Sequence, residues 1–358
     1  MMLTINNAVK IFSQGTPNEH KALSGLNLHL ERGEFVTVVG SNGAGKSTMF
    51  NAICGNFLLN SGSIFVDGQN ITYMKEHKRA GFIGRVFQDP MKGTAPNLTI
   101  EENLALAYSR QKTGPFGAAV NKKNRDMFKE ALSEFNMGLE DRMNVPIGTL
   151  SGGQRQAVTL LMATILTPKI LLLDEPFSSL DENLRCEMAD LVRKLHHEMG
   201  LTVVMVTHDK EEAMKVSDRI ALMKAGEVLQ YDKPERMFYH PESRVVADYM
   251  GQTNYIFGKV ENGRFVSRAV SFETQKAEGE YELMVRPSAI TLTVDETERM
   301  YQIEEVMFEG ETAEILLKYA DGKLTVWMLH RDWMKLGVKT GELVGIKIDE
   351  RQGILFQK

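Results

Sequence analysis

A short glycine-rich segment constrains this chain more than any other feature of its sequence. Residues 40–48 read Gly-Ser-Asn-Gly-Ala-Gly-Lys-Ser-Thr, which matches the phosphate-binding pattern G-x-x-x-x-G-K-[S/T]. The apolar run Phe35–Val39 comes directly before this loop and is typical of a buried strand, while Ser47–Phe50 can begin a helix. This context of strand, loop and helix predicts an α/β fold that binds a nucleoside triphosphate.

The residue types in the loop suit a phosphate ligand. Gly40, Gly43 and Gly45 let the backbone turn tightly, so that successive N–H groups and the helix N-terminus can hold phosphate oxygens. Lys46 is expected to reach the β- and γ-phosphates, and Ser47 to offer its hydroxyl to Mg²⁺. The alternative, a glycine-rich turn before an ordinary helix, fits this context poorly. The predicted nucleotide-binding residues of the loop are Gly40, Ser41, Asn42, Gly43, Ala44, Gly45, Lys46, Ser47 and Thr48.

Composition limits what the rest of the chain can be. The chain has 358 residues, 43% of them hydrophobic, which is enough for two globular cores, and its formal net charge of −5 argues against general affinity for nucleic acid. The first residues lack the apolar core of a secretory signal, and no run of about 18 apolar residues occurs, so we expect no membrane-spanning helix. The two cysteines have no paired spacing, which argues against a disulfide framework or a zinc site and favours a cytoplasmic protein.

The order of the predicted elements indicates a first α/β domain. Leu26–Leu30 alternates like a half-buried strand, and residues of about 89–165 have a mainly helical pattern. The short apolar runs Ile170–Leu173 and Val203–Val206 are typical of parallel strands that are covered on both faces. Asp181 can cap the helix between them, so this region predicts a strand, helix and strand crossover.

Hairpin patterns predominate after about residue 241 and indicate a second domain. Val260–Val266 and Tyr319–Leu324 each place Asn-Gly or Asp-Gly between apolar residues, the pattern of a tight hairpin. Further apolar segments extend to Ile354–Phe356, which predicts a small β-barrel or sandwich. We therefore expect domains at residues 1–244 and 245–358.

Polar residues at the ends of apolar strands form the candidate catalytic group. Asp174 and Glu175 end one such run, where ligands collect in open α/β sheets. We expect Asp174 to support Mg²⁺ and Glu175 to polarise the water that attacks the γ-phosphate. His208 follows the next run and can donate to the γ-phosphate, while Gln88 can touch Mg²⁺ or the attacking water. A solvated acid pair and structural roles for His208 and Gln88 are the alternatives when each is considered alone.

A second possible anion site lies at Leu150-Ser151-Gly152-Gly153-Gln154, which begins a helical stretch. Gly152 and Gly153 expose backbone N–H groups and Ser151 adds a hydroxyl, so the segment suits a second grip on phosphate. Taken alone, the segment is better explained as a turn with a serine cap.

Together, these motifs resemble the nucleotide-binding subunits of ATP-binding-cassette (ABC) transporters over residues of about 2–245. The resemblance implies a P-loop ATPase that uses ATP and Mg²⁺, with Ser47, Gln88 and Asp174 toward the metal and Glu175, His208 and Gln88 in catalysis. Many members carry tyrosine at the adenine-stacking position, so a core role for Phe12 is an equal alternative. The elements occur in the family's order as Phe12, Gly40–Thr48, Gln88, the signature Ser151, Gly152, Gly153 and Gln154 with Leu150, Asp174-Glu175, the loop Ser179-Leu180-Asp181, and His208.

The resemblance also implies an assembly. Two copies pack head to tail as a homodimer or pseudo-symmetric dimer, so that each ATP lies between the loop of one copy and Ser151–Gln154 of the other. The helical insert, residues of about 89–150, receives a cytoplasmic helix of a transmembrane permease subunit. Such a protein lies at the cytoplasmic face of the cell membrane and works with a solute-binding protein.

Two segments give different indications of the solute. Val285–Ile290 resembles the OB-like (TOBE) regulatory domain of importer ATPases that serve sugars, polyamines, iron and oxyanions. Residues 87–105 look more like a bacterial group suspected of moving aromatic amino acids. Two other functions are alternatives: a soluble ABC-superfamily ATPase that acts on DNA or ribosomes, and a structural protein with a dead site. The chain has no long coiled-coil insert or second cassette, and it keeps Lys46, Glu175 and His208.

Overall fold

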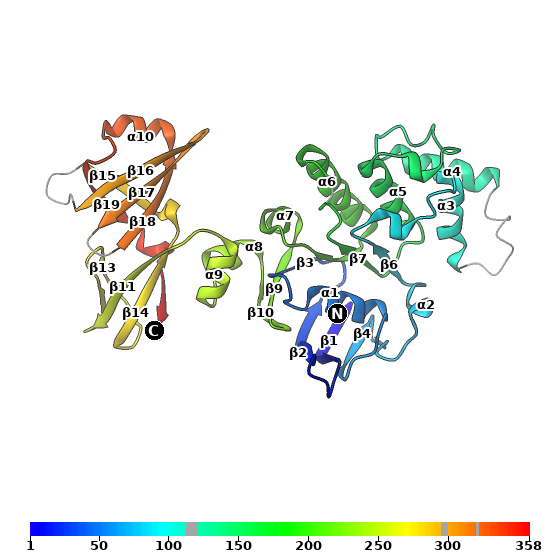
Figure 1. Cartoon of the computed structure of the whole chain (residues 1–358), viewed down its shortest axis with the longest axis horizontal. Helices are drawn as coiled ribbons and strands as arrows, with labels where there is room; N and C mark the ends of the chain where they lie inside the picture. Colours follow the sequence, from blue (N-terminus) through cyan, green and yellow to red (C-terminus); the bar gives the residue numbers. More distant parts are fainter. Residues whose placement is uncertain (112–120, 179, 295–299, 320–321) are drawn as a thin grey trace. The chain divides into compact units, whose positions relative to one another are not determined.

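The computed structural model describes residues 1–111, 121–178, 180–294, 300–319 and 322–358 (Figure 1). Its internal contacts divide the chain into two compact units, Met1–Pro234 and Glu235–Lys358. None of the described helices combines the length and the hydropathy that crossing a membrane requires.

The first unit is built on a six-stranded sheet with the order β10-β9-β3-β8-β7-β6. The inner strands are parallel and β10 is antiparallel, and every residue of β3 and β8 is buried, which confirms the predicted α/β fold. The strands are β3 (Phe35–Val39), β6 (Ile83–Val86), β7 (Ile170–Asp174), β8 (Thr202–Val206), β9 (Arg219–Lys224) and β10 (Glu227–Asp232).

A second, antiparallel sheet covers one face of this sheet. Its order is β2-β1-β4-β5, formed by β1 (Leu3–Phe12), β2 (His20–Leu30), β4 (Ser61–Val66) and β5 (Gln69–Asn70). Helix α1 (Lys46–Cys54) shares a hydrophobic core with both sheets, and Val36, Val38 and Leu172 point into this core. Their neighbours Phe35, Leu171 and Leu173 point into a different core on the opposite face, as strand alternation requires.

Helices occupy that opposite face (Figure 1). Within the described residues, the predicted helical region contains three of them, and Thr99 caps the first through a capping box with Glu102. Asp181 accepts a hydrogen bond from the backbone N–H of Leu184, which confirms the predicted cap. The helices on this face are α3 (Ile100–Tyr108), α4 (Lys122–Ser133), α5 (Gly152–Thr164), α6 (Glu182–Met199) and α7 (Lys210–Val216). Helix α2 (Glu76–Arg79) contacts α1 instead, since Arg79 donates to the carbonyls of Ala52 and Ile53.

The second unit is an all-β domain preceded by two short helices, as the hairpin patterns predict. Two five-stranded sheets, β13-β12-β11-β14-β20 and β15-β19-β16-β17-β18, contribute to one shared core (Figure 1). Its elements are α8 (Pro234–Tyr239), α9 (Arg244–Met250), β11 (Asn254–Glu261), β12 (Arg264–Val266), β13 (Ser271–Glu273), β14 (Gly279–Val285), β15 (Ile290–Thr293), β16 (Tyr301–Glu309), β17 (Thr312–Tyr319), β18 (Gly322–Leu329), α10 (His330–Leu336), β19 (Leu343–Ile348) and β20 (Ile354–Gln357).

Both predicted hairpins are present. Glu261 pairs with Arg264 across Asn262 and Gly263, whose φ angles of 52° and 73° are those of a tight primed turn. Tyr319 pairs with Gly322 in the second hairpin, and its turn residues 320–321 lie outside the described residues.

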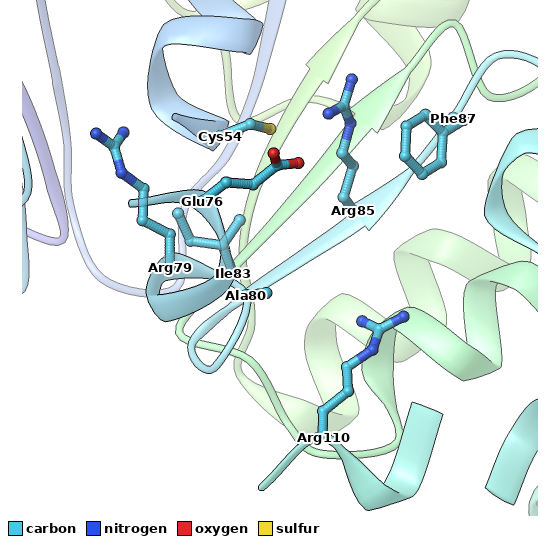
Figure 2. Close-up of a pocket in the computed structure, with 8 residues that line it drawn as sticks. All are labelled: Cys54, Glu76, Arg79, Ala80, Ile83, Arg85, Phe87 and Arg110. Carbon is cyan, nitrogen blue, oxygen red and sulfur yellow. The ribbon is translucent and has the colours of Figure 1, made fainter. Parts of the chain in front are cut away.

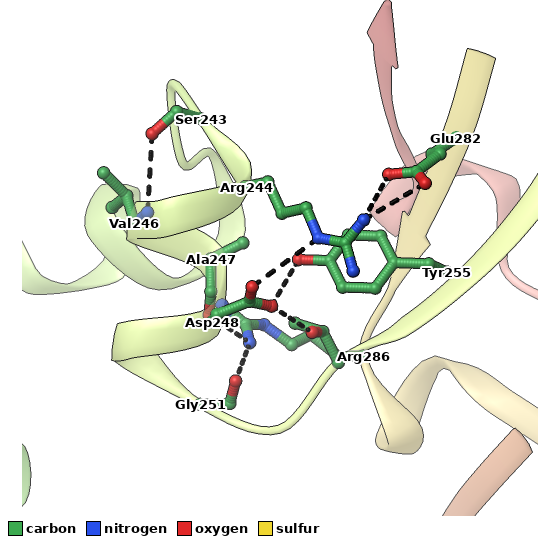
Figure 3. Close-up of polar contacts among 10 residues, drawn as sticks. Ser243, Arg244, Val246, Ala247, Asp248, Gly251, Tyr255, Glu282 and Arg286 are labelled. Atoms are coloured by element: carbon green, nitrogen blue, oxygen red, sulfur yellow. Dashed lines mark hydrogen bonds and ion pairs between the residues drawn. The ribbon is translucent and has the colours of Figure 1, made fainter. Parts of the chain in front are cut away.

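Arg286, in the segment that resembles the regulatory domain, fastens α8 and α9 to this domain (Figure 3). Its guanidinium is 1% exposed and donates to the carbonyls of Ala247, Gly251, Gln252 and Phe238. Because burial disfavours the charged form, the pKa of Arg286 is lowered to about 10. Both helices therefore belong to the β-rich unit, whereas the functional boundary at residues 244/245 stays a prediction.

Candidate functional site

A pocket of about 190 Å³ lies at the phosphate-binding loop. It gathers residues from the first two strands, from the loop and from the end of β7. The lining residues are Phe12, His20, Ala22, Asn42, Gly43, Ala44, Gly45, Lys46, Ser47, Thr48 and Glu175.

The glycines of the loop adopt the backbone conformations that the sequence predicts. Gly40, Gly43 and Gly45 have φ angles of 150°, 82° and 101°. A Cβ atom on Gly45 would lie 2.5 Å from the carbonyl oxygen of Ala22, and one on Gly40 would collide with the carbonyl of Met223. Gly45 is also the N-cap of α1 and makes no side-chain cap, so the first N–H groups of α1 are available to an anion.

Lys46 lies at the centre of this loop. Its Nζ atom donates to the carbonyl oxygens of Gly40 at 2.6 Å and Ser41 at 3.2 Å, and the residue is 7% exposed. Burial lowers the pKa of Lys46, and the carboxylate of Glu175 opposes this shift. The ammonium is thus held by two carbonyl oxygens of the loop, next to the start of α1.

The three predicted catalytic residues meet at one carboxylate oxygen. The Nε2 atom of Gln88 donates to Oε2 of Glu175 at 3.1 Å, and Nδ1 of His208 lies 3.4 Å from the same oxygen. Glu175 itself has a φ angle of 42°, and its N–H donates to the carbonyl of Val206 on β8. Gln88, Glu175 and His208 follow β6, β7 and β8, so the parallel order of these strands brings them together. The positive φ angle of Glu175 is a strained backbone conformation, and such strain is frequent at active sites.

Asp174 precedes this group at the end of β7. Burial raises the pKa of its carboxyl, while the guanidinium of Arg85 lowers it and the carboxylate of Glu175 raises it further. No cluster of three His, Cys, Asp or Glu side chains suited to a metal occurs among the described residues. Asp174 offers one carboxylate next to Glu175, and Mg²⁺ bound with a nucleotide uses one or two carboxylates together with phosphates and water.

The signature residues lie apart from this pocket. Ser151 accepts a hydrogen bond from the N–H of Gln154 and forms a capping box at the start of α5, as the serine-cap reading expects. A Cβ atom on Gly153 would lie 2.9 Å from Cγ of Leu184, so this glycine is needed for helix packing. Ser151, Gly152, Gly153, Gln154 and Asp181 do not line the pocket. Ser179 lies outside the described residues.

Phe12 does line the pocket and is 37% exposed, which argues against the alternative of a core aromatic. Its ring packs edge-on against Phe57 with 5.4 Å between centroids, and the ammonium of Lys10 lies near both rings. Neither His20 nor Ala22 is among the predicted site residues, although both line the pocket. Both precede Leu26–Leu30 on the same strand, but register shifts interrupt the alternation between them, so the pattern of Leu26–Leu30 does not predict which way His20 and Ala22 face.

Comparison with known proteins identifies the family. The ABC transporter family matches residues 23–178. The chain is 32% identical over 330 residues to the Fe(3+) ions import ATP-binding protein FbpC of Vibrio cholerae, covering 90% of this chain and 89% of that protein. It is also 37% identical over 228 residues to the tyrosine transport ATP-binding protein of Clostridioides difficile, covering 64% of this chain and 90% of the relative.

Solved structures agree with these relatives. A dimeric ATP-binding cassette in a post-hydrolysis state, bound to ADP and Pi, is 32% identical with a TM-score of 0.57 and covers 65% of this chain and 98% of its own. The cbiO1 protein of Clostridium perfringens, part of the ABC transporter complex cbiONQ, is 29% identical with a TM-score of 0.58 and covers 67% of this chain and 92% of its own. The chain therefore belongs to the ATP-binding subunits of ABC transporters, and it is an ATPase of the importer type.

Proposed function

We propose that two copies of this chain hydrolyse ATP at the cytoplasmic face of the cell membrane and power solute import through separate permease subunits. One observation carries the assignment of the residues: Gln88, Glu175 and His208 converge on a single carboxylate oxygen beside the phosphate-binding loop. This arrangement can hold a triphosphate and remove a proton from water at its terminal phosphate.

Each residue has a defined role in the proposed reaction. The N–H groups of the loop and the ammonium of Lys46 bind the phosphate oxygens and stabilise the charge that develops on them. Glu175 accepts the proton of the attacking water as the new P–O bond forms and the bond to the ADP oxygen breaks. His208 donates to the γ-phosphate, and Gln88 orients Glu175 through the 3.1 Å contact.

Mg²⁺ is the expected partner of the triphosphate. The hydroxyl of Ser47 and the carboxylate of Asp174 would hold it, since one lies in the pocket and the other ends the strand that leads to Glu175. When bound, the ion neutralises the charge on the phosphate oxygens. The amide of Gln88 contacts Glu175, so a role for Gln88 at the metal requires this side chain to rotate.

A head-to-tail homodimer explains why the signature residues do not line the pocket of their own chain. Two solved structures of one cassette with 32% identity are dimeric, which supports the same assembly here. In this arrangement Ser151–Gln154 of one copy, with the free N–H groups at the start of α5, contact the γ-phosphate held by the other copy. Asp181, at the start of α6, lies near the same junction.

Mixing two inactive variants tests this arrangement. Ser151→Arg blocks the signature segment, and Lys46→Ala removes the ammonium that binds the phosphates. In a mixed dimer, the natural loop of one chain therefore meets the natural signature of the other in one intact site, and both changes fall in the second site. We expect the mixture to hydrolyse ATP faster than either variant alone. A mixture that stays as inactive as its components would contradict the shared site.

A groove next to Gln88 is the proposed contact for a cytoplasmic helix of the permease (Figure 2). It has a volume of about 180 Å³ and is lined by Cys54, Glu76, Arg79, Ala80, Ile83, Arg85, Phe87 and Arg110. Arg79 is occupied with backbone carbonyls of residues 52, 53, 72 and 74. Arg85 packs over the ring of Phe87 at 4.2 Å, so the groove adjoins the residue before Gln88.

The two relatives are named for Fe(3+) import and for tyrosine transport, and these differ just as the two sequence indications do. We infer that the permease and the solute-binding protein select the solute. Purification of the chain from its native membrane tests the proposal, since permease chains are expected with it, whereas ribosomes or DNA would support the soluble alternative.

A further inference from the structure

Among the described residues that line the pocket at the phosphate-binding loop, His20 is the one histidine. It begins β2 and lies directly opposite Phe12 in the pairing of β1 with β2, so both side chains project from the same face of this ribbon. The His20 side chain is exposed. Within the described parts of the chain, it makes no hydrogen bond, ion pair or ring contact. Packing therefore gives no reason for this imidazole.

The position of His20 along β2 relates it to the parts of a bound nucleotide. Ala22 marks the phosphate end of the strand, because its carbonyl oxygen lies against Gly45 of the loop. His20 is two residues earlier on β2, beyond the register shift between the pairs of Lys10 and Ile11, and lies up to about 7 Å from Ala22 along the strand, on the side away from the phosphates. Phe12, the proposed stacking partner of the base, lies at the same level across the ribbon. The sugar of a nucleotide lies between its phosphates and its base, so we expect it between the level of Ala22 and that of His20 and Phe12, within reach of the imidazole.

We propose that His20 binds the ribose of ATP by a hydrogen bond between its imidazole and a sugar hydroxyl, as a second nucleoside contact opposite Phe12. This inference rests on the proposed ATP site. It makes the pocket selective for ribonucleotides over deoxynucleotides, a property that the loop cannot supply because phosphates are the same in both.

Nucleotide binding to the full-length protein tests this role. Calorimetric titration would compare ATP, 2′-deoxy-ATP and 3′-deoxy-ATP on the natural chain and on His20→Ala. His29→Ala is the matched control, because His29 is exposed on the same strand, pairs with Thr4 and does not line the pocket. We expect His20→Ala to weaken ATP about fivefold, the effect of one ordinary hydrogen bond, and to leave one deoxy analogue unaffected. The deoxy analogue whose affinity is the same for the natural chain and for His20→Ala lacks the hydroxyl that His20 binds.

Two results would overturn the role of His20. One is a natural chain that binds ATP and both deoxy analogues equally well. The other is a His20→Ala variant that binds ATP like His29→Ala, or that weakens all three nucleotides by the same factor. Failure of the proposed function looks different: Lys46→Ala would then bind ATP as tightly as the natural chain.

Discussion

Replacing Glu175 with glutamine distinguishes a general base from a structural carboxylate. The amide keeps the shape of the side chain and one oxygen, so the contact from Gln88 and the left-handed backbone at φ 42° can persist. The change removes only the capacity to accept a proton. General base catalysis contributes about 10²- to 10⁴-fold, which is about 3–5 kcal/mol of transition-state stabilisation. ATP binding depends on the loop and Lys46, so the dissociation constant should stay the same.

The assay measures phosphate release at saturating ATP together with equilibrium binding of ATP. Glu187→Gln is the control, because Glu187 is an exposed carboxylate on α6 and does not line the pocket. We expect Glu175→Gln to reduce turnover by about 10²- to 10⁴-fold. The variant should bind ATP with an unchanged dissociation constant and should accumulate as an ATP-bound dimer. Turnover equal to that of Glu187→Gln would refute the role of Glu175 as the base.

Three further changes test the fold. A chain ending at Pro234 should be monodisperse in gel filtration and bind ATP. A chain ending at residue 249 should aggregate, because it exposes Met237, Val246 and Ala247, which are fully buried in the second unit. Equal behaviour of the two truncated chains would contradict this division. Arg286→Lys should destabilise the β-rich unit by about 3 kcal/mol in denaturant unfolding, since four carbonyls lose their donor, and Arg264→Lys, at an exposed ion pair, should have little effect. Burial lowers the pKa of His196, so the neutral imidazole stabilises the fold above its unfolded pKa of about 6.5, and this contribution is lost as the pH falls through the lower folded value. His196→Gln should therefore reduce the fall in unfolding midpoint between about pH 7 and pH 5, and the exposed His197→Gln should not.

Local patterns were enough to predict most of the pocket and two helix caps outside it. The loop, the ends of β7 and β8 and the caps at Ser151 and Asp181 all depend on residues that are close in sequence. The meeting of Gln88 with Glu175 depends on strand order, which no local pattern contains. Strand β1 escaped prediction because register shifts after Ile5 and Ala8 interrupt its alternation. His20 was missed with it, because its importance comes from facing Phe12.

The second unit shows the same division between local and distant information. Its hairpins follow from Asn-Gly and from the apolar residues around it. The attachment of α8 and α9 follows from one buried guanidinium that reaches back about 40 residues to their carbonyls. The change from helical patterns to hairpin patterns in the sequence marks where the hairpins begin. It does not reveal whether a helix near that boundary packs on the first unit or on the second.

Gln88 and Phe87 are adjacent in the chain, yet one touches the carboxylate of Glu175 and the other lines the arginine-rich groove. In the proposed assembly, a single peptide unit therefore separates the residue that contacts the permease from the residue that contacts the catalytic carboxylate. A partner that displaces the ring of Phe87 therefore acts on the residue next to Gln88, over a path of one peptide bond. In the proposed assembly, this short connection couples ATP hydrolysis to the permease, so that hydrolysis is slow when no permease helix occupies the groove.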